Sequence, residues 1–304
     1  MDRLNYHHLL YFWMVAREGT IARASAELRL SQPAVSGQIR ALEHAIGERL
    51  FERAGRRLRL TSVGQVVFEY AQGIFTLGRD LAETLAGRSS GRPLRIGVAD
   101  VVPKLISHRL IQPVLGLPGT LRLIVREDDA ERLFAELGFH RLDVVITDAP
   151  APQSSQRLFS HLLGESALCL LAADPLARRL RRRFPASLDG QPFLLPSEGT
   201  PLRRTIDNWF RRMRLAPRVV GEFDDSALVK SFGADGAGAF VVPDAIAANV
   251  LRQYGVRRVG LLEGAVERFY AVTAERKLSH PAVTAILESA QNELFGKRGP
   301  GRIP

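Results

Sequence analysis

The sequence predicts an α/β protein with an N-terminal winged helix-turn-helix, a long connecting helix and a larger C-terminal domain. Three observations support this fold class. Residues 4–60 contain short helical patterns with capping residues, followed by an arginine-rich turn. Residues 62–87 carry an apolar repeat at helical spacing. From Leu94 onward, short apolar strands alternate with helices, as is typical of α/β domains.

The first helices are indicated by their apolar spacing and by their caps. Apolar residues predict a helix over residues 4–18, which Gly19 ends. Thr20 is suited to cap a second, short helix. Ser31 is suited to cap a third helix, whose first turn contains Pro33, where a missing N–H costs nothing. Two short helices joined by such a tight turn predict a helix-turn-helix.

The third helix combines an apolar stripe with a narrow polar face. The positions that face inward at this spacing are Val35, Ile39, Leu42 and Ile46. The opposite side is small and polar at its start. A DNA major groove admits a helix whose entering end is narrow and bears hydrogen-bond donors and acceptors. We therefore predict base contacts from Gln32, Ser36 and Arg40.

Residues 50–60 predict a two-stranded wing after the third helix. Gly55 lies between two short apolar patterns and is suited to the turn. Arg53 and Arg56 flank this glycine, and arginines at such a tip can enter the minor groove or contact phosphates. The alternative is a helical module whose surface arginines are merely solvated. The ordered set of features favours DNA binding.

Ordered motifs within residues 4–64 resemble those of one protein family. They include SQPAVS at residues 31–36, QIRALE at residues 38–43 and LFER at residues 50–53. These motifs are similar to those of the LysR-type transcriptional regulators. The resemblance implies a winged helix-turn-helix, a linker helix and a C-terminal effector domain with two α/β subdomains of the periplasmic-binding-protein type. Gly37 departs from the pattern, because many members carry a larger polar or basic residue there.

The resemblance extends the predicted DNA-binding set and implies partners. The predicted set is Ser31, Gln32, Pro33, Ser36, Gln38, Arg40, Arg53 and Arg56. Double-stranded DNA is the main partner implied, and RNA polymerase is a further one. No cofactor is implied.

Residues 62–87 predict a dimerisation helix. Their apolar residues follow a four-three repeat, which indicates the seam of a coiled coil rather than the broader stripe of a globular helix. The predicted seam residues are Val63, Val67, Tyr70, Ile74, Leu77 and Leu81. Pairing along this seam would bring two recognition helices to half-sites roughly one helical turn apart. The alternative is that this apolar seam packs against the chain's own effector domain. The resemblance implies homodimers that assemble into tetramers.

These elements define the predicted domains. We place the winged helix-turn-helix at residues 1–61, the linker helix and hinge at residues 62–90, and the effector domain at residues 91–304. The hinge contains the sequence RSSGRP. The resemblance places subdomain I at about residues 91–164 and 265–295, and subdomain II at about residues 165–264. The chain then crosses between them near Gly164 and Gly264.

The effector domain is predicted from short buried strands and intervening helices. Strands are expected at residues 94–98, 121–125, 144–147, 168–172, 218–221, 239–242 and 270–273. Helices are expected at residues 131–138, 206–213, 227–232 and 246–253. Because ligands of open α/β sheets bind beyond the carboxyl ends of the strands, the residues after each strand are candidates for an effector site.

Acidic and hydroxyl residues occupy these positions. The predicted effector site comprises Asp100, Val101, Glu127, Asp128, Asp148, Ser197, Thr200, Asp224 and Asp225. Many family members hold a carboxylate effector with small hydroxyl residues near the first position, so Asp100 disfavours an anionic ligand. Converging carboxylates repel one another unless a cation or a donor neutralises them, which favours a cationic effector, inorganic or organic. The alternative is that these acids cap the following helices.

A narrower resemblance also favours a cationic effector. LNYHHL at residues 4–9, GVAD at residues 97–100 and GEFDDSAL at residues 221–228 are similar to the branch of LysR-type activators that controls sodium-proton antiporter genes. This implies sodium or alkaline stress as the signal. Because regulators with similar helices can serve different operons, a metabolic operon with an organic effector is the alternative.

Composition limits the remaining functions. The net charge of +10 favours polyanions, so a non-specific architectural DNA-binding protein is a further alternative, although it would not need an α/β cleft. The single cysteine, Cys169, excludes an intramolecular disulfide and is expected to be a buried thiol. Scattered histidines and the lack of nucleophile motifs argue against an enzyme. Without a signal segment or a membrane-spanning apolar run, we expect a cytoplasmic protein.

Overall fold

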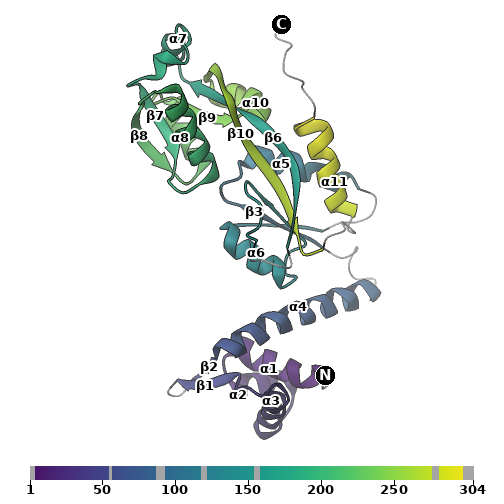
Figure 1. The fold of residues 1–304 in the computed structure, drawn as a ribbon. Helices are drawn as coiled ribbons and strands as arrows, with labels where there is room; N and C mark the ends of the chain where they lie inside the picture. Colours follow the sequence, from purple (N-terminus) through teal and green to yellow (C-terminus); the bar gives the residue numbers. More distant parts are fainter. Residues whose placement is uncertain are drawn as a thin grey trace. The chain divides into compact units, whose positions relative to one another are not determined.

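The computed structural model describes residues 4–54, 57–86, 93–117, 122–153, 158–275 and 281–296. These residues form two compact units, Met1–Arg92 and Pro93–Pro304, each of which is described by itself (Figure 1). The first unit contains the winged helix-turn-helix and a long helix, and the second contains the α/β domain. Most of the predicted hinge, at residues 88–92, lies outside the described residues.

Three short helices begin the first unit: α1 (Tyr6–Glu18), α2 (Ile21–Leu28) and α3 (Gln32–Ile46). The predicted caps are confirmed, because the hydroxyls of Thr20 and Ser31 accept hydrogen bonds from backbone N–H groups three residues later, at 3.2 and 3.3 Å. Helix α1 begins after Asn5, whose side chain accepts a hydrogen bond from the His7 N–H at 2.9 Å. That cap explains why the helix does not start at Leu4 as predicted.

The wing and the long helix complete this unit. Strands β1 (Phe51–Ala54) and β2 (Arg57–Leu60) pair antiparallel, and α4 (Ser62–Leu85) follows them. Their shared core is formed by buried side chains that include Leu9, Phe12, Val35, Leu42 and Leu50. Gly64 allows α4 to approach the wing closely, because a Cβ at this position would lie 2.0 Å from the Leu50 carbonyl oxygen.

A six-stranded sheet organises the second unit, in the order β4-β3-β5-β10-β6-β9. Its strands are β3 (Leu94–Ala99), β4 (Leu123–Asp128), β5 (Val144–Thr147), β6 (Phe159–Ala172), β9 (Phe240–Pro243) and β10 (Arg257–Thr273). Strand β3 is parallel to β4 and β5, whereas β10 is antiparallel to β5 and β6. Strands β7 (Pro192–Pro196) and β8 (Arg218–Phe223) form a separate parallel pair.

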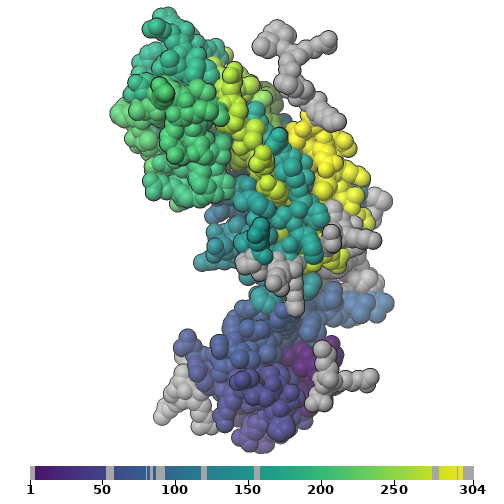
Figure 2. All heavy atoms as spheres, viewed as in Figure 1, coloured from purple at the N-terminus to yellow at the C-terminus, as the bar shows by residue number. Residues whose placement is uncertain are grey.

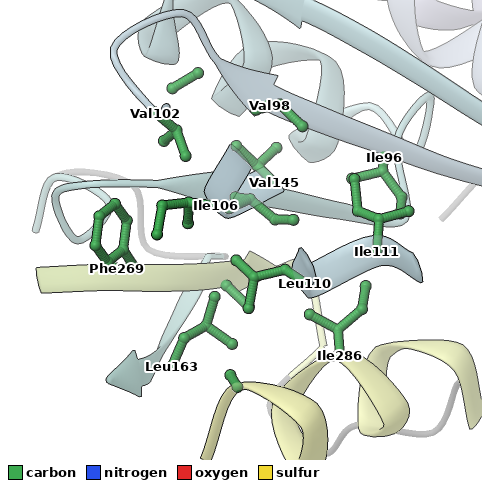
Figure 3. Packing of buried hydrophobic residues seen from close by; sticks show 14 of the residues in the cluster. Ile96, Val98, Val102, Ile106, Leu110, Ile111, Val145, Leu163, Phe269 and Ile286 are labelled. Carbon is green, nitrogen blue, oxygen red and sulfur yellow. The ribbon is translucent and has the colours of Figure 1, made fainter. Parts of the chain in front are cut away.

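Helices cover these sheets and enclose two hydrophobic clusters. The helices are α5 (Lys104–Ile111), α6 (Ala130–Gly138), α7 (Leu176–Arg181), α8 (Pro201–Met213), α9 (Ser226–Ala234), α10 (Asp244–Tyr254) and α11 (Pro281–Ser289). Short helical turns follow at η1 (Gln112–Gly116), η2 (Ala186–Leu188) and η3 (Ala290–Leu294). In the larger cluster, Ile96 of β3, Ile106 and Leu110 of α5 and Ile286 of α11 pack together (Figure 3).

The structure differs from the prediction in the length of two strands. Residues 168–172 and 270–273, predicted as short strands, are the ends of β6 and β10, which pair along most of their lengths. Polar residues alternate with apolar ones in these strands, and a bulge between Leu261 and Val266 contains Gly264 with a φ of +71°. These interruptions hide the strands from a search for apolar runs. Atoms of β10, drawn in yellow-green, are visible at the surface in Figure 2.

Candidate functional site

The exposed face of α3 is the first candidate site. Ser31, Gln32, Pro33 and Arg40 are exposed, whereas Ser36 and Gln38 are half-buried. The opposite face is anchored in the core by Val35, Ile39 and Leu42. The burial pattern thus presents the predicted polar side chains at the helix surface and fixes the helix from behind, as an element that enters a groove requires.

Gly37 leaves this face flat at its centre. A Cβ at this position would meet no atom within 4 Å among the described residues. Glycine inside a helix is less stable than alanine by roughly 0.5–1 kcal/mol, and neither packing nor a positive φ requires it here. A close approach of another molecule to the α3 backbone would give this glycine a function.

The wing is attached to α3 through Glu43. Its Oε1 accepts hydrogen bonds from the Leu50 N–H at 2.8 Å and the Phe51 N–H at 3.3 Å. At the same open end of the hairpin, the Thr61 hydroxyl donates to the Arg49 carbonyl at 2.7 Å. Glu43 therefore positions the wing, a role that sequence analysis did not assign to it although it lies in the quoted QIRALE motif.

The predicted wing arginines are only partly described. Arg53 lies in β1 opposite Leu58 of β2. Arg56 and Gly55, predicted at the tip, lie outside the described residues.

Helix α4 presents an exposed apolar stripe. Tyr70, Ile74, Leu77 and Leu81 of the predicted seam are exposed, the last two by 52 and 60 %. Val63 and Val67 differ from the prediction, because they pack against the core of the first unit. The start of α4 has to close that core, so the exposed stripe instead begins at Val66 and continues to Leu85.

A cleft in the second unit is the second candidate site. Its apolar lining includes Val101, Leu194, Phe223, Val241 and Ile246. Its polar lining is supplied by Thr200, Asp224, Ser226 and Lys230. Of the predicted effector residues, Val101, Thr200 and Asp224 line this pocket, whereas Asp100, Glu127, Asp128, Asp148, Ser197 and Asp225 do not.

Several predicted ligand groups instead have partners within the chain. Asp225 caps α9 by accepting a hydrogen bond from the Ala227 N–H at 2.7 Å. Thr200 caps α8 by accepting one from the Arg203 N–H at 3.1 Å. Three more exposed acids of the predicted set also have partners: Asp100 accepts from the Val101 N–H, Glu127 pairs with Lys104, and Asp128 pairs with Arg132.

The predicted convergence of exposed carboxylates is therefore not found. Within the described parts of the chain, no group of three or more His, Cys, Asp or Glu side chains has the spacing of a metal site. The structural reason is that these acids follow strand ends that also begin helices or face lysine and arginine. Capping, the alternative reading, accounts for Asp225, and the neighbouring Asp129 caps α6 through the Glu131 N–H at 2.8 Å.

A buried charged cluster lies elsewhere in the same unit. Glu267 of β10, Lys230 of α9 and Asp148, which follows β5, are only 4, 6 and 8 % exposed. Of these three residues, only Asp148 belongs to the predicted effector site. Glu267 could have been found from strand periodicity, because it alternates with the buried residues Ala265 and Phe269 on the inward face of β10.

Burial shifts the pKa of each member of this cluster. Burial, with Asp148 nearby, raises the pKa of Glu267 to about 8, against the opposing effect of Lys230. Burial also raises the pKa of Asp148 to about 6, and it lowers the pKa of Lys230 to about 8. Near neutral pH, Glu267 is therefore mainly a neutral acid, while Asp148 and Lys230 are mainly charged.

Cys169 is buried in the sheet, as predicted. Burial raises the pKa of its thiol to about 12, so the nucleophilic thiolate is scarce at neutral pH. This environment favours a structural thiol over the alternative of a redox sensor.

Comparison with known proteins assigns both units. A family model described as a bacterial regulatory helix-turn-helix protein of the lysR family matches residues 6–65. A second, described as a LysR substrate binding domain, matches residues 87–294. The chain belongs to the LysR family. The resemblance drawn from the sequence motifs is thereby confirmed, and with it the combination of an N-terminal helix-turn-helix and a C-terminal substrate-binding domain.

Individual known proteins resemble the chain over nearly its whole length. The transcriptional activator protein NhaR of Escherichia coli (strain K12) is 34 % identical over 97 % of this chain and 98 % of its own length. ArgP from Mycobacterium tuberculosis has a similar fold, with a TM-score of 0.69 at 21 % identity over 97 % of this chain and 100 % of its own. CbnR in complex with its target DNA has a TM-score of 0.61 at 20 % identity, covering 94 % of this chain and 98 % of its own.

In the described part of this LysR-family chain, no helix has the length and apolarity to cross a membrane.

Proposed function

We propose that this LysR-family protein is a sequence-specific DNA-binding transcriptional activator that responds to an effector in its C-terminal domain. The observation that carries the proposal is the solvent-exposed polar face of α3, where Gln32 and Arg40 lie opposite a buried apolar face. Exposed donors and acceptors at the start of a helix fixed from behind are what reading base edges requires. The proposed set also includes Ser31, Pro33, Ser36, Gln38, Arg53 and Arg56.

The exposed stripe of α4 supplies the proposed dimer contact. An apolar row from Val66 to Leu85 is unfavourable in water and would be buried by an equivalent row on a second chain. A dimer presents two copies of α3 to a site with two-fold symmetry. Assembly into a tetramer and contact with RNA polymerase complete the proposal at the promoter.

The cleft of the second unit is the proposed effector site. The resemblance of the sequence motifs to the branch of LysR-type activators that controls sodium-proton antiporter genes supports a cationic signal such as sodium, with such a gene as the target. The buried acids Asp148 and Glu267 also favour a cation. A second candidate is an organic effector, which the apolar lining of the pocket by Leu194, Phe223 and Ile246 favours.

Footprinting of the full-length protein on DNA upstream of its own gene and of neighbouring genes tests this function. Sodium and potassium are compared at the same ionic strength, because total salt alone weakens DNA binding. We expect a protected region whose internal cleavage changes with sodium only. Protection that is the same in both ions would contradict the sodium signal, and the absence of any protected region would contradict DNA reading.

A further inference from the structure

Glu267 is a buried acid without a partner. Its side chain is 4 % exposed, and in the described parts of the chain neither of its carboxylate oxygens has a hydrogen-bond partner. Its strand, β10, lies between β5 and β6, and Glu267 itself pairs with Ser166 of β6. Buried polar groups are nearly always hydrogen-bonded, so two orphaned oxygens on one side chain indicate a group that this chain alone does not satisfy.

The charged groups that act electrostatically on Glu267 belong to two other parts of the second unit, the segment after β5 and helix α9. Asp148, after β5, is 8 % exposed, and its Oδ2 also has no hydrogen-bond partner among the described residues. Lys230 of α9 lines the cleft pocket, and its ammonium donates to the Ser226 hydroxyl at 3.2 Å. Further out, Asp100 and Arg204 act on Asp148, and Lys104 and Asp225 act on Lys230.

The charges of the three central groups define what the cluster can accept. With both carboxylates ionised and the lysine protonated, the cluster carries a single net negative charge. One proton or one monovalent cation brings it to neutrality, whereas a divalent cation would leave an uncompensated positive charge. Uncompensated charge is strongly disfavoured in a buried site, so the cluster matches a monovalent cation.

We infer that Glu267 and Asp148 form a site for one monovalent cation, which replaces the proton carried by Glu267. The inference rests on the proposed function, because a cation bound at this cluster, which shares Lys230 with the lining of the cleft, would act as the effector of the second unit. In this exchange the Glu267 O–H bond breaks, the proton leaves to solvent, and both carboxylates then face the bound cation. An inorganic ion and a small organic ammonium share this chemistry.

The exchange gives the site a definite pH dependence. Below pH 8, the cation has to displace a proton that Glu267 holds, so cation affinity rises with pH. Above pH 8, Glu267 is already ionised, and the dependence on its proton disappears. Loss of the Lys230 proton near pH 8 acts in the same direction, because it makes the cluster more negative.

Proton release on cation binding tests the inference directly. Sodium, lithium, potassium or methylammonium chloride is added to the weakly buffered full-length protein, at an ionic strength held constant with a bulky quaternary ammonium salt. A pH indicator counts the protons. We expect at least one of these cations to release about one proton per chain at pH 7, and far less at pH 9. Proton release with sodium, lithium or potassium would identify an inorganic ion as the ligand, whereas release with methylammonium would identify an organic ammonium.

Matched variants identify the group that holds the proton. Glu267→Gln should release none, whereas Glu263→Gln, which removes an exposed carboxylate from the same strand, should behave as the wild type. In Asp148→Asn, the charges of ionised Glu267 and protonated Lys230 cancel, so the cluster no longer carries a net negative charge. This variant should therefore weaken cation binding by about tenfold or more. This second variant also covers the case in which Glu267→Gln does not fold.

Three results would overturn the inference. They are the absence of proton release with every cation, undiminished release in Glu267→Gln, and unchanged cation affinity in Asp148→Asn. Footprinting of the same proteins without added cation measures sequence-specific DNA binding independently of the cation site. DNA protection without proton release would reject this site and leave the proposed regulator function intact.

Discussion

At the scale of single residues, Glu267 makes the stability of the protein depend on pH. Its pKa is raised from 4.5 to about 8 on folding, so between these values the unfolded chain loses a proton that the folded chain keeps. The contribution to stability is therefore fully present below pH 4.5 and is lost as the pH rises to about 8. The expected loss is about 5 kcal/mol.

Urea denaturation between pH 4.5 and pH 8 measures this effect. Glu267→Gln keeps the shape of the neutral acid and cannot ionise, so the free energy of unfolding should fall less with pH than in the wild type. Glu263→Gln serves as the exposed control on β10 and should follow the wild type. Parallel pH profiles for wild type and Glu267→Gln would contradict the buried, neutral state of this acid.

Gln32 is the residue whose loss should relax sequence preference. It is exposed at the first position of α3, where a side-chain amide can pair with the edge of one base. Gln32→Ala should weaken binding to the operator by about 1–3 kcal/mol and leave binding to random DNA nearly unchanged. Fluorescence anisotropy with both DNAs at one salt concentration checks this, and equal losses on both would argue against a base contact.

Which residues could be predicted depended on how local their signals are. The caps Thr20 and Ser31 were predicted because a cap is defined by residues within one turn. Glu267 was missed because its significance arises from burial between two strands distant in sequence, β5 and β6. A glutamate at an exposed strand position, such as Glu263, is solvated and does not indicate a functional site, so the residue type alone could not single out Glu267.

At the scale of elements, α4 is expected to hold two chains together. Leu77 and Leu81 are exposed on a stripe whose burial needs a partner. Leu77→Asp should place a charge in that seam and shift the protein toward monomers, with a matching loss of cooperative operator binding. Sedimentation velocity measures the shift, and Arg79→Asp, an exposed site on the same helix, is the charge control. An unchanged oligomeric state in Leu77→Asp would remove the stripe from the interface.

Elements were predictable where their patterns are regular and unbroken. Helices α1, α2 and α3 of the first unit and the buried strand β5 follow directly from apolar spacing. The long strands β6 and β10 were predicted only at their apolar ends, since bulges and exposed polar residues interrupt the rest. The exposed stripe of α4 was displaced from its predicted start for a tertiary reason: Val63 and Val67 are used by the winged-helix core.

At the scale of the whole molecule, the proposed function requires that the second unit influence how two copies of the first unit bind DNA. An effector can shift such an equilibrium only through its different affinity for the two arrangements. Strand β10 carries Glu267 in its centre and continues into both hydrophobic clusters, through Val259 and Val272. A charge change at Glu267 is thus placed where it can act on the packing of both clusters.

Selection of bound sequences from a random DNA library by the purified full-length protein tests the central claim most directly. Reading by paired copies of α3 predicts enrichment of an inverted repeat, with half-site centres separated by about one helical turn or a multiple of it. Gln32→Ala should lose preference at one position in each half-site. Tight binding without any enriched sequence would contradict the account and would identify the chain as a non-specific DNA-binding protein.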